Sequence, residues 1–197
     1  MPDKESVKEN IIVVGGGYGA NVARSISASL DASKFNLILI NPLPYRIHLV
    51  ATARMVVSDK DKLEDTAFMP YDKLFHNGKG KFIQALVSSV EKDVIVLESG
   101  ERLPYFALVV ATGSKWSGPI AFPREASAVS SYLAERRKEF KNANNIVIVG
   151  GGAVGIGISV FLASALTSTD IHQTLLEKSR MPGQYAFIHL RVEPAPF

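Results

Sequence analysis

One short pattern occurs twice in this sequence, and it restricts the possible folds more than any other feature. Residues 10–20 read "NIIVVGGGYGA" and residues 144–157 read "NNIVIVGGGAVGIG". An uncharged run of Ile and Val is typical of a strand buried in a parallel sheet. Three consecutive glycines after such a strand predict a tight turn into a helix. The repetition therefore predicts two strand–turn–helix units and an α/β fold.

The spacing of the glycines indicates what these turns bind. Both copies follow the pattern G-x-G-x-x-G/A, with Gly15, Gly17 and Ala20 in the first and Gly150, Gly152 and Gly155 in the second. The first glycine makes the turn, the second lets the backbone approach a pyrophosphate, and the third small residue lets helix and strand pack closely. Free N–H groups at the helix N-terminus favour the anion. One copy alone is equally compatible with a glycine-rich turn in any α/β protein, but two copies predict two bound dinucleotides.

Apolar periodicity and turn residues predict the elements around the two motifs. The first unit is expected as a strand at Ile11–Val14, a helix at about Tyr18–Leu30 and a strand at Phe35–Ile40, then an irregular connection over 41–58 and a charged, partly helical segment over 59–80. Strands at Lys81–Val90, Val94–Glu98 and Tyr105–Ala111 are expected to form a β-meander that returns to the parallel sheet. A hinge over 112–123 and an amphipathic helix over 124–141 lead to the second unit. The predicted fold class is thus α/β, a Rossmann-like parallel sheet with an inserted β-meander, followed by an incomplete second Rossmann-like βαβ unit.

Composition excludes several other classes of protein. The 197 residues include 22 Lys and Arg against 19 Asp and Glu, and this small excess does not favour nucleic acid as a partner. There is no cysteine, which excludes disulfides, Cys-ligated metals and a redox-active Cys pair, and we predict no metal site. The first ten residues contain no apolar stretch typical of a signal peptide, so a cytoplasmic location, or one peripheral to a membrane, is expected.

One uncharged segment, residues 146–166, is long enough to resemble a membrane span. Its β-branched start is followed by closely spaced glycines, a pattern that favours strand, turn and helix instead. We therefore predict no transmembrane span. Detergent-dependent solubility would indicate the alternative, a membrane-anchored protein.

The residue that ends the second strand of each unit bears on the type of dinucleotide. The motif expects an acidic residue about 20 positions after the glycines, where it hydrogen-bonds a ribose hydroxyl. Asn41 occupies this place in the first unit and Glu177 in the second. Asparagine can bind a hydroxyl without charge assistance, and Glu177 would favour NADH over NADPH. An ordinary surface glutamate at the end of a strand explains Glu177 equally well.

Two dinucleotides in one chain are most simply explained by hydride transfer from a nicotinamide to a flavin. The segments "VVGGGYGA", "NPLPYRIHLVATAR", "LVVATGS" and "IVIVGGGAVG", in this order, resemble the two-dinucleotide flavoprotein oxidoreductases of the pyridine nucleotide-disulfide oxidoreductase superfamily. Within them, the sequence is most similar to the apoptosis-inducing factor-like and ferroptosis-suppressor-like branch, particularly its fungal members. The resemblance covers about residues 10–180, and the absence of cysteine agrees with this branch.

The resemblance implies roles for particular residues. The pyrophosphate of FAD would be bound by the first glycine motif, which consists of Gly15, Gly16, Gly17, Tyr18, Gly19 and Ala20. Asn41 would lie near the adenosine ribose, Arg54 at the flavin's phosphates and the backbone of Val87 near the adenine. The cofactor would be covered by Ala111, Thr112 and Gly113. NADH or NADPH, with NADH favoured, would be bound by Gly150, Gly152, Gly155 and Glu177. The chemistry of arginine also supports phosphate binding by Arg54, because a guanidinium makes bidentate contacts with phosphate. The alternative is that Arg54 forms an ion pair with a nearby acidic residue. No catalytic residue is predicted, because the flavin accepts the hydride.

The resemblance also implies a division of the chain. Residues 1–122 would form an FAD-binding domain without its C-terminal return segment, 123–143 a hinge and connecting helix, and 144–197 a partial NAD(P)H-binding unit with an atypical tail. The family usually has a glutamate where this sequence has Gly157, and it continues for roughly as many residues again. The chain is therefore expected to be C-terminally truncated.

Two hypotheses on function follow. The leading one is an FAD-dependent NAD(P)H oxidoreductase that passes electrons to a quinone or another small acceptor. This chain would be a truncated member that is weakly active or inactive, and it could form a homo-oligomer. The alternative is a non-catalytic nucleotide-binding fragment or interaction partner. The flavin content of the purified protein distinguishes the two.

Overall fold

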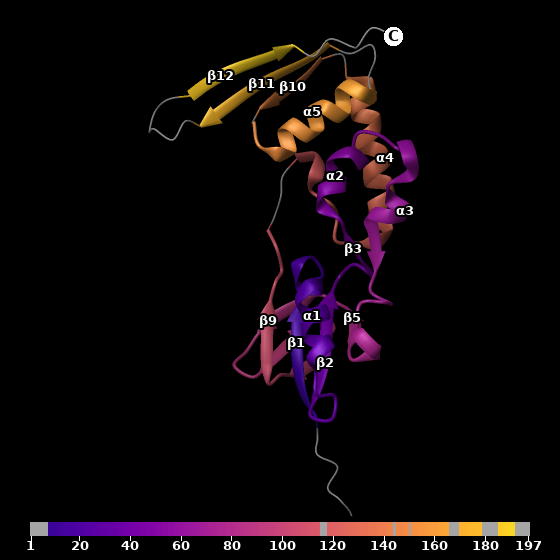
Figure 1. Ribbon diagram of the computed structural model, residues 1–197, viewed down its shortest axis with the longest axis vertical. Helices are drawn as coiled ribbons and strands as arrows, with labels where there is room; N and C mark the ends of the chain where they lie inside the picture. Colours follow the sequence, from indigo (N-terminus) through magenta and orange to yellow (C-terminus); the bar gives the residue numbers. More distant parts are fainter. Residues whose placement is uncertain are drawn as a thin grey trace, which may run out of the picture. The chain divides into compact units, whose positions relative to one another are not determined.

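The structure is a computed structural model that describes residues 8–114, 118–143, 145–149, 151–165, 170–178 and 185–191 (Figure 1). The chain divides into two compact units. The first consists of Met1–His48, Ala67–Lys115 and Arg124–Ala126, and the second of Leu49–Thr66, Trp116–Pro123 and Ser127–Phe197. The second unit thus includes a segment, 49–66, that lies inside the FAD-binding domain expected over 1–122. The division of the chain into an FAD-binding domain and an NAD(P)H-binding unit stays a prediction.

A parallel four-stranded sheet forms the centre of the first unit, in the order β5-β2-β1-β9. Its strands are β1 at Glu9–Val14, β2 at Phe35–Asn41, β5 at Lys81–Gln84 and β9 at Ala107–Val110. Helix α1, Tyr18–Ser29, connects β1 to β2. Both faces of the two central strands are covered, which explains why their sequences are apolar without alternation. The predicted α/β class with a Rossmann-like parallel sheet is confirmed.

Two buried clusters, one on each face, hold this sheet between its covering layers. The cluster on the α1 side contains Val13, Leu37 and Leu39 of the strands and Ala20 and Ala23 of the helix. The cluster on the opposite face contains Ile12, Ile38 and Ile40 of the strands and Ile95 and Leu97 of the meander. Neighbouring residues of one strand enter different clusters because successive side chains point to opposite faces.

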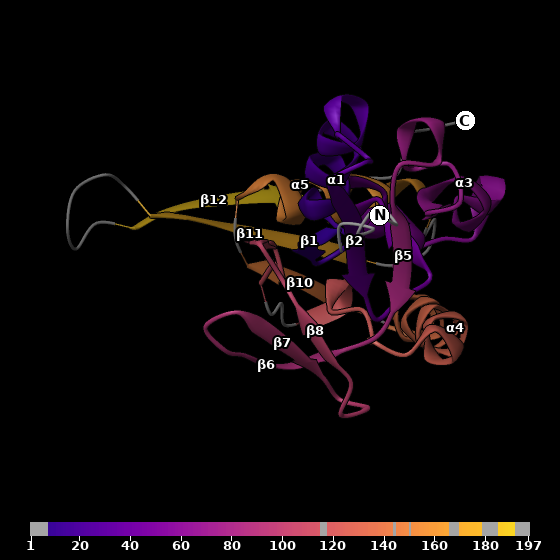
Figure 2. The same ribbon diagram turned by 90° about the horizontal axis from the view of Figure 1, so that it is seen from below.

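The meander consists of β6 at Val87–Val90, β7 at Val94–Leu97 and β8 at Arg102–Pro104 (Figure 2). The single strand expected over 81–90 is therefore two strands, β5 and β6. The chain passes from the parallel sheet to the meander between Ala85 and Leu86. The Ala85 N–H donates to the Asn41 carbonyl at the end of β2, at 3.2 Å, and the Leu86 carbonyl accepts from the Glu98 N–H of the meander, at 2.9 Å. The strand expected over Tyr105–Ala111 is the shorter β9, and β8 before it was not predicted.

The connection predicted as irregular over 41–58 contains two regular elements, so that prediction was wrong. Strand β3, Tyr45–Ile47, pairs antiparallel with β4, Phe68–Pro70, and helix α2 spans Leu49–Met55. The prolines of this segment, Pro42 and Pro44, interrupt only its start, and the Leu, Ala, Arg and Met residues of α2 favour a helix. The charged segment that follows is partly helical, as predicted, with η1 at Lys60–Lys62, α3 at Glu64–Ala67 and η2 at His76–Gly78.

In the second unit, the short turn η3, Gly118–Ile120, and helix α4, Ala126–Asn142, precede a three-stranded sheet in the order β10-β11-β12. Strands β10, Asn145–Val149, and β11, Asp170–Lys178, are parallel and are connected by α5, Ala153–Ala165, which is the predicted second βαβ unit. Strand β12, Tyr185–Arg191, is antiparallel to β11. Among the described residues, no helix has the length and apolar character needed to cross a membrane.

Candidate nucleotide-binding site

The first glycine of the first motif is fixed by a close approach of two strand ends. Gly15 has a φ of +107°, which side chains of L-residues rarely allow, and its N–H donates to the Ile40 carbonyl at 2.8 Å. A Cβ built on Gly15 would lie 2.1 Å from the Ala111 carbonyl oxygen at the end of β9. Ala111 N–H in turn donates to the Val14 carbonyl at 2.8 Å. The structure therefore brings the first motif together with Ala111 at the carboxyl ends of β1 and β9.

Gly16 is enclosed on the inner side of the loop by two side chains that come from distant parts of the sequence. Its N–H donates to Asn41 Oδ1 at 2.8 Å, and its carbonyl accepts a hydrogen bond from the Tyr71 hydroxyl at 3.1 Å. A Cβ on Gly16 would lie 1.7 Å from Tyr71 Oη and 2.7 Å from Asn41 Cγ. No side chain larger than hydrogen fits here without displacing one of them.

Asn41 therefore supports the loop in addition to any contact with a ribose. Its Oδ1 accepts from Gly16 N–H, and its Nδ2 donates to the Leu43 carbonyl at 2.9 Å. Both ends of the amide are used, and an aspartate could make only the first of these bonds because it has no donor when ionised. This explains an asparagine at a position where the motif expects an acid. The contact with the adenosine ribose stays a prediction.

The outer side of the loop is open. A Cβ on Gly17 would meet nothing within 4 Å, and the Tyr18 side chain is 80% exposed at the start of α1. Within the part of the chain that the structure describes, the Gly17 N–H has no hydrogen-bond acceptor. Open space beside an unpaired N–H at a helix N-terminus is what close approach of a pyrophosphate requires. The residues present here fit the dinucleotide that the sequence predicts.

Close packing of α1 on the sheet involves two small residues. Ala20, the third position of the predicted motif, is 1% exposed. Gly19 approaches more closely, because a Cβ there would lie 3.1 Å from both Ala111 Cβ and Val13 Cγ1. The packing role that the motif assigns to one position is thus shared by two.

The other residues expected around FAD in the first unit lie in the meander and after β9. Val87 is half-buried in β6, in register with Leu97 of β7. Thr112 and Gly113 are exposed beyond the end of β9, and Gly113 has a φ of +73°, with nothing within 4 Å of an added Cβ. Of these residues, Ala111 and the backbone nitrogen of Thr112 lie against the glycine loop, because a Cβ on Gly15 would be 2.1 Å from the Ala111 carbonyl oxygen and 3.0 Å from Thr112 N. The roles of all four residues in FAD binding stay predictions.

Arg54 lies near the end of α2, in the second unit. Its guanidinium forms an ion pair with Asp61 of η1. An ion pair with a nearby acidic residue is the alternative to phosphate binding that the sequence analysis gave for Arg54. Asp61 has a φ of +64°, an unusual conformation for a residue other than glycine. A phosphate would have to compete with Asp61 or bind the remaining guanidinium donors, so the predicted contact of Arg54 with the flavin's phosphates stays a prediction.

One arginine of α4 forms hydrogen bonds with both ends of the loop that carries Asp61. Arg137 Nε donates to the Met55 carbonyl at 2.7 Å, where α2 ends, and its guanidinium pairs with Glu64, where α3 begins. Both side chains of this ion pair are largely buried, at 20% and 24% exposure. The second oxygen of Glu64 has no hydrogen-bond partner among the described residues. Sequence analysis interpreted 124–141 only as an amphipathic helix and did not predict this contact.

Replacing Arg137 with methionine is expected to lower the free energy of unfolding by about 2 kcal/mol, because the Glu64 carboxylate loses its partner while it stays largely buried. Urea unfolding followed by circular dichroism measures the change. The matched control is Arg102→Met, which removes the exposed pair with Glu91 and is expected to cost less than about 1 kcal/mol. Equal losses in the two variants would contradict the structural role of Arg137.

The second glycine motif is described in part. Gly150 and the side chain of Glu177 lie outside the described residues. A Cβ on Gly152 would meet nothing within 4 Å, as at Gly17, and the Gly152 carbonyl accepts from Ile156 N–H in the first turn of α5. Gly155 lies within α5, and Glu177 lies in β11, opposite Ala186 of β12. The predicted contacts of these residues with NADH or NADPH stay predictions.

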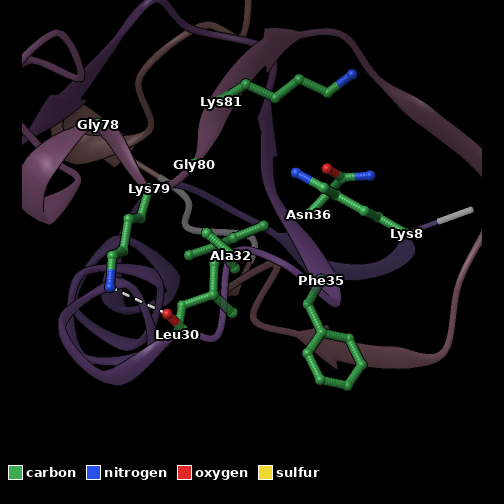
Figure 3. A pocket seen from close by; sticks show the side chains of 10 residues that line it. Lys8, Leu30, Ala32, Phe35, Asn36, Gly78, Lys79, Gly80 and Lys81 are labelled. Carbon is green, nitrogen blue, oxygen red and sulfur yellow. Dashed lines mark hydrogen bonds between the residues drawn. The ribbon is translucent and has the colours of Figure 1, made fainter. Parts of the chain in front are cut away.

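An open pocket of the first unit lies away from these positions (Figure 3). It is lined by residues from the start of β2 and β5 and from the connections before them, among them Phe35, Lys79 and Lys81, and by Lys8, which precedes β1. The glycine loop follows the opposite, carboxyl end of β1. No residue of the predicted cofactor sites lines this pocket, and the Lys79 ammonium is already bound to the Leu30 carbonyl at 3.1 Å. Among the described residues, no group of three or more His, Asp or Glu side chains is placed to hold a metal ion.

Comparison with known proteins identifies the family. Residues 9–183 match the family described as Pyridine nucleotide-disulphide oxidoreductase. The chain belongs to this family. The order of the motifs in the sequence and the parallel sheet of the first unit agree with this assignment, and the resemblance stated from the sequence is confirmed.

Individual relatives agree with the predicted branch of the family. The chain is 57% identical over 109 residues to the FAD-dependent oxidoreductase FVFD30 of Flammulina velutipes, covering 53% of this chain and 34% of the relative. It is 36% identical over 187 residues to Apoptosis-inducing factor homolog B of Dictyostelium discoideum, covering 93% and 44%. It is 31% identical over 160 residues to Ferroptosis suppressor protein 1 of Homo sapiens, covering 77% and 40%. The chain therefore spans less than half the length of these relatives.

The fold is also similar to that of solved structures. NADH:rubredoxin oxidoreductase from Clostridium acetobutylicum superposes with a TM-score of 0.59 at 20% identity, over 88% of this chain and 48% of that chain. At this identity the likeness supports the fold alone.

Proposed function

We propose that this protein is an FAD-dependent NAD(P)H oxidoreductase and that the first glycine motif binds the FAD pyrophosphate. The observation that carries the proposal is the loop Gly15–Gly17, whose inner side is fixed by β9, Asn41 and Tyr71 and whose outer side is open. When bound, the flavin accepts a hydride from the nicotinamide. The residues of the chain supply binding and orientation. Gly17 N–H, at the helix N-terminus, is the proposed donor to the pyrophosphate, and the exposed Tyr18 side chain stands beside it.

The second glycine motif is proposed to bind NADH or NADPH, with Gly152 at the close approach of the backbone to the pyrophosphate. The acceptor of the electrons is proposed to be a quinone or a similar small molecule. The absence of cysteine from the 197 residues supports an acceptor other than a disulfide formed within this chain. A cytoplasmic location, or one peripheral to a membrane, and a homo-oligomeric state belong to the same proposal.

The experiment that tests this function is the flavin content of the purified protein, before and after incubation with FAD. Flavin absorbance in an equimolar amount supports the oxidoreductase, and steady-state oxidation of NADH with a quinone then tests turnover. A colourless protein that does not take up added FAD favours the second hypothesis, a non-catalytic fragment or interaction partner. Nucleotide binding without flavin binding would identify such a fragment as a nucleotide-binding one.

Replacing Glu177 with serine is expected to reduce the preference for NADH over NADPH about tenfold, because a carboxylate beside the ribose repels the 2′-phosphate. Titration of both nucleotides against both proteins measures the ratio of dissociation constants. The control is Glu98→Ser, which makes the same change after β7 of the first unit. An unchanged ratio in Glu177→Ser would remove this residue from the nicotinamide site.

A further inference from the structure

Tyr71 is a buried residue that no motif of the sequence explains. It follows β4, and its side chain is 4% exposed. The ring packs at a tilt against Phe82 of β5, with 4.6 Å between the ring centroids. The hydroxyl donates to the carbonyl of Gly16 at 3.1 Å, across 55 positions of sequence. A phenylalanine would fill the same space in the core, so the hydroxyl needs an explanation of its own.

The hydroxyl acts on one particular peptide group. The carbonyl of Gly16 and the N–H of Gly17 belong to the same peptide unit, which is planar and trans, so the two bonds point in opposite directions. Holding the Gly16 oxygen toward the buried Tyr71 therefore turns the Gly17 N–H away from the core. On that outer side, a Cβ on Gly17 would meet nothing within 4 Å. A rotated peptide would present the carbonyl oxygen to this space, and a carbonyl repels a phosphate.

The neighbouring peptide is fixed in the same way. Gly16 N–H is held by Asn41 Oδ1 at 2.8 Å, so both polar groups of Gly16 are bonded on the inner side of the loop. The absence of a Cβ at Gly16 allows this arrangement, because the atom would lie 1.7 Å from Tyr71 Oη. A tyrosine hydroxyl is already protonated at physiological pH, and burial raises the pKa of Tyr71 further.

We propose that Tyr71 is a positioning residue for dinucleotide binding: its hydroxyl orients the Gly16–Gly17 peptide so that the Gly17 N–H faces the pyrophosphate. The inference rests on the proposed function, that the first motif binds FAD. It goes beyond that function because it assigns to a residue outside the glycine motif the orientation of the N–H that binds the anion.

The test is Tyr71→Phe, measured with three ligands by calorimetry. FAD and ADP contain the pyrophosphate, and adenosine does not. The dissociation constants of FAD and ADP are expected to rise by the same factor, about five- to tenfold for the loss of one orienting hydrogen bond, and that of adenosine is expected to stay unchanged. The matched control is Tyr105→Phe, which removes a hydroxyl bonded to the carbonyls of Glu91 and Lys92 in the meander of the same unit. It is expected to leave all three dissociation constants unchanged.

A spectroscopic measurement separates orientation from stability. In the ¹H–¹⁵N spectrum of the wild type, ADP is expected to shift the Gly17 amide strongly downfield, and in Tyr71→Phe this shift is expected to shrink by at least half. This reads the folded protein directly, even where the variant is less stable.

Three results would overturn the inference. If the wild type binds neither FAD nor ADP, the proposed function fails and the inference fails with it. If the wild type binds both and Tyr71→Phe binds them equally well, only the role of Tyr71 is wrong. If adenosine weakens by the same factor as ADP, the hydroxyl supports the unit as a whole and does not orient the peptide.

Discussion

Replacing Gly17 with valine is expected to raise the dissociation constant of FAD at least about a hundredfold, or roughly 2.7 kcal/mol, while the apoprotein stays folded. The valine side chain would project from the outer side of the loop, where the pyrophosphate is proposed to bind. The protein itself has room for the side chain, because a Cβ at Gly17 meets nothing within 4 Å. The expected cost to folding is about 1–2 kcal/mol, from a poorer helix N-cap.

Flavin content after purification and titration with FAD measure the binding, and thermal unfolding of the apoprotein measures the fold. Gly152→Val is the matched control, because it makes the same change at the equivalent open position of the second motif. It is expected to leave FAD binding unchanged. Equal FAD retention by Gly17→Val and the wild type would show that the first motif does not bind the pyrophosphate.

Replacing Gly15 with valine is expected to destabilise the fold itself, whereas the change at Gly17 is expected to weaken FAD binding and leave the fold intact. The Cβ would lie 2.1 Å from the Ala111 carbonyl oxygen, which is backbone and cannot move without separating β9 from β1. The φ of +107° adds strain of about 1–3 kcal/mol. We expect the free energy of unfolding to fall by more than about 4 kcal/mol, as for other substitutions that combine a backbone clash with strain.

Urea unfolding measures this loss, and the control separates its two causes. Gly100 also has a positive φ, of +86°, but nothing lies within 4 Å of a Cβ there. Gly100→Ala is therefore expected to show the conformational cost alone, about 1–3 kcal/mol. A Gly15→Val protein as stable as Gly100→Ala would show that β9 does not pack against the loop as described.

The sequence predicts the parts of this fold that depend on local pattern. The strands β1, β2 and β10 and the helices α1 and α5 follow from apolar runs and from the glycines between them, because these features act within a few residues. Helix α2 was missed because two prolines suggested that the whole segment was irregular. The grouping of 49–66 with the second unit follows from contacts such as Arg137 with Glu64, which no local pattern indicates.

The candidate site shows the same limit. The motif indicates which glycines form the loop, but not that Gly16 is enclosed or that Gly19 shares the packing role with Ala20. Asn41 was singled out as a ribose ligand, and its two bonds to the backbone depend on the path of the chain after β2. Tyr71 was missed entirely, because its contact with Gly16 is set by where β4 and β5 bring the chain. A buried tyrosine has no sequence pattern that distinguishes it from an exposed one.

The contacts of Gly15 and Gly19 with Ala111 place different restrictions on how this sequence can change. Gly15 faces the carbonyl oxygen of residue 111, which every amino acid has, so no change at 111 can compensate for a side chain at 15. Gly19 faces two side chains, because a Cβ there would lie 3.1 Å from both the Cβ of residue 111 and Cγ1 of Val13, so the sizes of these three residues restrict one another. A side chain at position 15 therefore meets the same backbone atom whatever residue stands at 111, whereas substitutions at positions 13, 19 and 111 are expected to be epistatic, so that their order matters.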